Sequence, residues 1–157
     1  MPNGDTHSKA TVILAIASGC FAYYLGQPLV QAAALTGGAL VGLVLTPDLD
    51  VDKGCVSNEV VRRSVGRKGE KFWSLYWRPY GVMIPHRSRL SHMPLVGTAI
   101  RLMYLAILPA LIYWFATGAG FSAGTRFTQP VFPAWGWWAI GGLVLADTLH
   151  YIMDYWS

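Results

Sequence analysis

Residues 94–117 read PLVGTAIRLMYLAILPALIYWFAT, an apolar run that contains a single charged residue, Arg101. A helix that crosses a lipid bilayer needs about 20 predominantly apolar residues. Three further runs come close to this length and composition, at about residues 10–25, 28–46 and 135–153. The sequence therefore predicts an all-α protein, an integral membrane bundle of about four transmembrane helices.

The composition of the chain agrees with a single membrane domain, residues 1–157. Hydrophobic residues make up 54% of the sequence and charged residues only 13%, whereas a soluble domain carries about 25% charged residues. The two cysteines, Cys20 and Cys55, form no CxxC motif. Their spacing favours neither a disulfide framework nor a thiolate zinc site.

Basic residues gather in the connection between the second and third predicted spans, residues 47–93. Between residues 51 and 92 there are nine basic residues and three acidic ones, whereas Arg126 is the only charged residue in the two other connections. Such asymmetry indicates a cytoplasmic loop, and an even number of spans then places both termini in the cytoplasm. The net charge of +4 therefore favours membrane lipids as partners and not nucleic acid, since no nucleic-acid-binding motif is present.

This topology would bring the ionisable residues of distant segments to one membrane face. In the last predicted span, Asp147, His150 and Asp154 follow one another at positions i, i+3 and i+7, which share a helix face. Ionisable residues within a span are costly and usually functional, and helical metal sites use the same residue types. The alternative for Asp147 is a counterion for Arg101, which we expect at a similar depth in the third span.

Two further segments flank the cytoplasmic ends of the spans. The turn Pro47-Asp48-Leu49-Asp50 follows the second span; a helix-end carboxylate can serve as a cap, but opposite several histidines it favours metal binding. Before the third span, His86 and His92 flank Arg87 and Arg89. Arginine binds phosphate oxygens bidentately, so this segment favours a combination of metal and anion binding. His7, ahead of the first span, falls on the same face.

These motifs also resemble a known family. The resemblance rests on Thr6-His7, on the turn at residues 47–50, on Trp77-Arg78-Pro79-Tyr80, on residues 84–92 and on the closing segment 150–156. They are similar to a bacterial family of membrane proteins of unknown function described as metal-binding, itself similar to a broader group named membrane-bound metal-dependent hydrolases. The resemblance covers nearly the whole chain, and it implies metal ligands at His7, Asp48, Asp50, His86, His92, His150 and Asp154.

The sequence thus predicts a metal-dependent hydrolase at the cytoplasmic membrane surface. Its expected metal ligands are His7, Asp48, Asp50, His86, His92, Asp147, His150 and Asp154. Asp50 or Asp154 would act as the catalytic base if it is not a ligand, and Arg87, Arg89 and Arg101 would bind an anionic substrate such as a lipid or isoprenoid phosphate. The mixed ligand set suits zinc first, with manganese or iron as alternatives. The alternative function is a non-catalytic metal-binding or structural subunit, either as a homo-oligomer or in a larger membrane complex.

Overall fold

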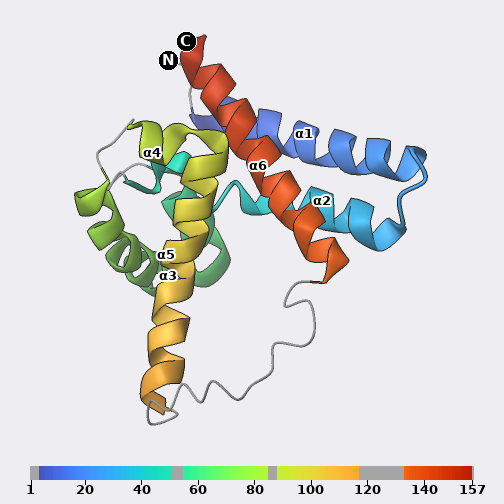
Figure 1. Ribbon diagram of the computed structural model, residues 1–157. Coiled ribbons are helices and arrows are strands. Elements are labelled where there is room, and N and C mark those ends of the chain that lie inside the picture. Colours follow the sequence, from blue (N-terminus) through green and yellow to red (C-terminus); the bar gives the residue numbers. More distant parts are fainter. Residues whose placement is uncertain (1–3, 51–54, 85–87, 117–132, 157) are drawn as a thin grey trace.

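The computed structural model describes residues 4–50, 55–84, 88–116 and 133–156, and these ranges are helical with no strand among them (Figure 1). The all-α class is therefore confirmed. The helices in chain order are α1 (Gly4–Tyr24), α2 (Leu29–Val41), the 3-10 helix η1 (Pro47–Asp50), α3 (Val56–Met83), α4 (Arg89–His92), α5 (Pro94–Ala116) and α6 (Ala134–Tyr155).

The first two helices form an antiparallel hairpin (Figure 1). Gly26 makes the turn at a positive φ of 84°, a conformation that costs glycine far less than other residues. The amide of Gly26 donates to the carbonyl of Tyr23 at 2.9 Å, and that of Gln27 donates to Ala22 at 3.1 Å. Both bonds close the end of α1 before Pro28 leads into α2.

Helix α6 crosses the hairpin and packs most closely against α2. A Cβ atom on Gly38 would lie 1.8 Å from the carbonyl oxygen of Ala139, and one on Gly142 would lie 2.0 Å from that of Leu35. The two helices approach so closely that only hydrogen fits between their backbones at these points. The small residues of α2 therefore fix where α6 sits, as is common in helix pairs of membrane proteins.

The connection between α2 and α5 folds back over the end of this helix pair. Ser57 on α3 donates a hydrogen bond to the carbonyl of Val44 at 2.6 Å, and the indole of Trp73 donates to Ser57 at 2.9 Å. Further along α3, the hydroxyl of Tyr76 donates to the carbonyl of Tyr104 on α5 at 2.8 Å. The buried core at this junction comprises Leu45, Leu49, Trp77, Tyr80, Ile84 and Leu143.

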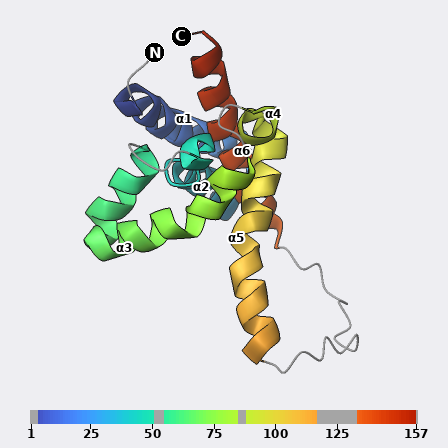
Figure 2. The ribbon, with the colours of Figure 1, turned by 90° about the vertical axis from the view of Figure 1, so that its left-hand side faces the viewer.

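Only one helix in the described ranges, Pro94–Phe115 of α5, is long and apolar enough to cross a membrane; its mean hydropathy is 2.0. Helix α2 has 13 residues, about 20 Å, because it ends at Val41 and not at Thr46 as the predicted span did. Figures 1 and 2 show α1 and α2 lying across the direction of α5, whose second half projects beyond the other helices. The four-span bundle therefore stays a prediction.

The contact between α2 and α6 yields a stability test with an adjacent control. We expect Gly38→Ala to lower the free energy of unfolding by about 1–3 kcal/mol, the usual cost of an overpacked contact. A Cβ atom on Gly37 would meet no atom within 4 Å, so Gly37→Ala should be neutral or slightly stabilising because alanine favours helix. Thermal unfolding of both variants in detergent measures the difference, and equal melting temperatures would contradict this account of the contact.

Candidate metal centre

Five histidine and aspartate side chains meet where four helices end or begin. His7 lies in the second turn of α1, Asp48 lies in η1, and His92 is the last residue of α4. His150 and Asp154 lie one turn apart near the end of α6. The structure thus brings these five of the predicted site residues together, and their convergence at a membrane face stays a prediction.

The nitrogen and oxygen atoms of this cluster face one another at short range. His150 Nε2 lies 3.2 Å from Asp154 Oδ2 and 3.5 Å from Asp48 Oδ2. His92 Nε2 lies 3.8 Å from Asp48 Oδ1 and 4.0 Å from Asp154 Oδ2. Only the first of these distances is short enough for a hydrogen bond. The two histidine nitrogens nevertheless point toward the same two carboxylates.

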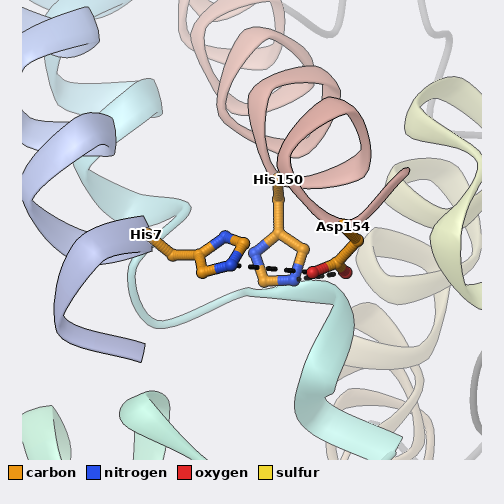
Figure 3. A group of neighbouring side chains, drawn as sticks. All are labelled: His7, His150 and Asp154. Carbon is orange, nitrogen blue, oxygen red and sulfur yellow. Dashed lines mark ion pairs between the residues drawn. The ribbon is translucent and has the colours of Figure 1, made fainter. Parts of the chain in front are cut away.

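Figure 3 shows His7 and His150 with Asp154, whose carboxylate both rings approach. His7 Nε2 lies 3.6 Å from Asp154 Oδ1, while the other carboxylate oxygen faces His150. The two imidazole rings have their centroids 4.6 Å apart. The His150 ring thus lies beside His7, and the Asp154 carboxylate directs one oxygen toward each of these two rings.

Burial differs between the two ligand types. The side chains of His7, His92 and His150 are 12%, 9% and 12% exposed, whereas those of Asp48 and Asp154 are 36% and 31% exposed. The imidazoles are therefore on the more buried side of the cluster, and the carboxylates are on its more exposed side.

At His7 and Asp48 the electrostatic environment favours the protonation states that metal binding needs. The pKa of His7 is lowered, mainly by burial and further by the neighbouring His150, against the opposing pull of Asp154 and Asp48. For Asp48, burial opposes ionisation, but contacts with His150 and His92 outweigh it and hold the pKa well below its usual range. A neutral imidazole and an ionised carboxylate are the forms that bind metals.

The cluster fits a transition-metal ion by two observations. Two groups, His7 with His150 and Asp154, and Asp48 with His92 and His150, have donor atoms within 4.8 Å of one another. Donors bonded at about 2.0–2.2 Å in a tetrahedral zinc site lie roughly 3.3–3.6 Å apart, close to the separations seen here. In addition, His7 Nδ1 is buried without a hydrogen-bond partner in the described part of the chain.

Asp147 and Arg101, two of the predicted site residues, are placed differently. Asp147 forms an ion pair with Arg101 and accepts a hydrogen bond from Thr98, and both members of the pair are only 1% exposed. The pairing corresponds to the alternative considered for Asp147, a counterion of Arg101. Neither group of close donor atoms includes Asp147, because this turn of α6 faces α5. Because Arg101 is buried, its guanidinium group is not accessible to a substrate.

Several predicted residues cannot be located in the site. His86 and Arg87 lie outside the described residues. Asp50 is the last residue of η1 and Arg89 the first of α4, but their side chains are outside the described part of the structure. Their proposed roles stay predictions.

Ser91, which had no assigned role, lies directly behind a predicted ligand. It is fully buried, and its Oγ lies 2.7 Å from Nδ1 of His92. Ser88 caps the short helix α4 by accepting a hydrogen bond from the amide of Ser91 at 3.2 Å. The spacing of Ser88 and Ser91 was a visible signal of such a cap, but the contact with His92 depends on the side-chain orientation.

His150 provides the most direct test of the centre because it belongs to both donor groups. We expect His150→Ala to lose most of the bound metal, since each group would keep only two donors. Thr148→Ala is the matched control, since its hydroxyl bonds only to the carbonyl of Val144 within α6. Elemental analysis of protein purified without chelators measures both, and full metal content in His150→Ala would disprove the assignment.

Comparisons with known proteins agree with this chemistry. Residues 2–157 match the model of a family described as "Uncharacterized metal-binding protein (DUF2227)". No curated protein and no solved structure matched the chain. The structure gathers three imidazoles and two carboxylates in two overlapping groups of donors, and since the family model spans nearly the entire sequence, the chain belongs to this family of uncharacterized metal-binding proteins.

Proposed function

We propose that this protein is a membrane-embedded, metal-dependent hydrolase that acts at the cytoplasmic membrane surface on a phosphorylated or lipid-like substrate. The observation that carries this proposal is the uneven burial of the cluster, with imidazoles at 9–12% exposure and carboxylates at 31–36%. A centre that is closed on one side and accessible on the other leaves room for a substrate, whereas a structural site is closed all round.

The donors form two overlapping groups that share His150, one with His7 and Asp154 and the other with Asp48 and His92. Such mixed sets of imidazole nitrogen and carboxylate oxygen suit zinc, with manganese or iron as alternatives. His7 lies beside the second oxygen of Asp154. When bound, such an ion polarises a substrate oxygen and acidifies a water ligand.

The chain's own residues would supply proton transfer and substrate binding. Asp154, which is partly exposed and lies near the imidazoles of His7 and His150, or Asp50 would serve as the base, whichever of the two is not a metal ligand. Arg87 and Arg89 lie in the sequence segment that ends in His92. A guanidinium group there would hold a phosphate group. The membrane setting favours an anionic lipid or an isoprenoid phosphate.

Helix α5 provides the support for the membrane setting. Its 22-residue apolar segment would extend about 33 Å, enough for the hydrocarbon core of a bilayer. Only 17% of its most apolar window is buried in the protein. Large apolar side chains of its second half are exposed, among them Ile107, Leu111, Ile112 and Phe115. In water such a surface would aggregate, whereas lipid would solvate it.

A non-catalytic metal-binding subunit is the second candidate. The burial of Arg101 favours this function. Arg101 contacts Asp147 and the carbonyl of Ser91, so its guanidinium does not face the cluster, where a substrate would bind. In that function the exposed α5 would contact other subunits of a membrane complex or a second copy of the chain, and the metal would hold the four converging segments together.

Turnover assays on the zinc-loaded protein separate the two functions. We expect hydrolysis of a lipid phosphate or an isoprenoid phosphate in detergent micelles, and Asp154→Asn should reduce kcat by about 100-fold or more if the carboxylate acts as base. Tyr151→Phe, on an exposed position of the same helix, is the control. Full metal loading without turnover on either substrate class would favour the non-catalytic subunit.

The predicted topology has its own test. Reporter enzymes fused to either end should signal a cytoplasmic location, because the basic loop between α2 and α5 directs that face inward. A periplasmic signal from either fusion would contradict the four-span topology. Fractionation should recover the chain with the membranes after carbonate washing, and its release into the soluble fraction would contradict the membrane assignment.

A further inference from the structure

The pair formed by Arg101 and Asp147 is among the most buried parts of the protein. Each side chain is 1% exposed, and the pair joins α5 to α6. Arg101 Nε and Asp147 Oδ1 have no hydrogen-bond partner in the described ranges. A buried ion pair with unsatisfied atoms contributes little to stability and can be worse than apolar packing. This favours a role in positioning neighbouring groups.

Arg101 reaches a third element, the end of α4. Its Nη1 donates a hydrogen bond to the carbonyl of Ser91 at 3.0 Å. Gly97 permits this contact, since a Cβ atom there would lie 2.3 Å from the same carbonyl oxygen and 3.3 Å from Nη1 of Arg101. The backbone of Ser91 is thus held against the first turns of α5, directly before His92.

The side chain of Ser91 extends this connection to the imidazole of His92. Ser91 Oγ lies within hydrogen-bond distance of the carbonyl oxygen of Ser88, at 3.2 Å, and of His92 Nδ1, at 2.7 Å. When the hydroxyl proton is donated to that carbonyl, the Oγ lone pair accepts a hydrogen bond from Nδ1–H. That tautomer leaves the lone pair on Nε2, the nitrogen that faces Asp48 and Asp154.

We propose that Ser91, Arg101 and Asp147 are positioning residues for His92, through which α6 controls the ligand on α4. Helix α6 carries His150 and Asp154 and also Asp147, which anchors the arginine that holds Ser91. One helix therefore supplies two ligands directly and fixes the orientation and tautomer of a third. This inference rests on the proposed metal centre. Groups that orient metal-bound histidines usually change metal affinity by 10- to 100-fold.

Ser91→Ala tests the hydrogen bond to His92. We expect the Kd for Zn²⁺ to rise about 10- to 100-fold, with unchanged stoichiometry at saturating metal and an altered visible absorption spectrum of the Co²⁺-loaded protein. Ser57→Ala is the matched control, because Ser57 is also fully buried, but its hydrogen bonds join Val44 and Trp73 and not the residues of the cluster. Equal Zn²⁺ affinities and Co²⁺ spectra in wild type and Ser91→Ala would overturn the proposal, and so would an equal loss of affinity in Ser57→Ala.

The ion pair is tested by removing both charges together, since a single substitution would leave a buried charge alone. Arg101→Met combined with Asp147→Leu should fold with wild-type helix content but bind Zn²⁺ about 10-fold more weakly and give the Co²⁺ spectrum of Ser91→Ala. Wild-type affinity in a folded double variant would overturn the role of the pair. If the double variant does not fold, Arg101→Lys, which keeps the charge but not the two-pronged contact, decides by the same two measurements.

The wild-type titration separates the failure of this proposal from failure of the proposed centre. If wild-type protein binds neither Zn²⁺ nor Co²⁺, the metal centre itself is wrong and the positioning role falls with it. If wild type binds metal and His150→Ala does not, the centre stands, and the Ser91 and Arg101 variants then decide the positioning role alone.

Discussion

The close contact between α2 and α6 is the constraint on which the arrangement of the site depends. Where Gly38 and Gly142 let the two backbones meet, the helices are fixed in register along each other. The chain that leaves α2 then delivers Asp48 to the level of His150 on α6, and α1, paired with α2, brings His7 to the same point. The distances between the ligands are therefore set by helix packing some turns away from them.

Charge balance explains why such a cluster can exist partly inside a protein. Two ionised carboxylates gathered beside three buried imidazoles would leave an excess of negative charge in a poorly solvated place. Protonated histidines could balance it, but His7 and His150 lie with their rings 4.6 Å apart, where two positive charges would repel. A divalent cation with neutral imidazoles gives a net charge of zero without that repulsion, which supports the proposal that the cluster is a metal centre.

The helical class could be predicted because it depends on local patterns, and five of the proposed ligands lie together in the structure, although their metal binding stays a prediction. Apolar runs marked α1, α2, α5 and α6, and helix spacing placed His150 and Asp154 on one face. The spacing could not show whether Asp147 is a metal ligand or the counterion of Arg101. Asp147 shares that helix face but lies one turn deeper, where it pairs with Arg101. The role of Ser91 was likewise hidden, since it depends on which way one hydroxyl proton points.

The ligands are widely separated along the chain, from His7 to Asp154, and this has a consequence for biosynthesis. A ribosome makes the chain from its N-terminus, so His7 is exposed long before its partners exist. The ion-binding geometry arises only once α6 has been synthesised and has docked onto α2. If these residues hold the ion as proposed, metal acquisition would follow the docking of α6, and a chain truncated before this helix would lack His150 and Asp154 of the centre.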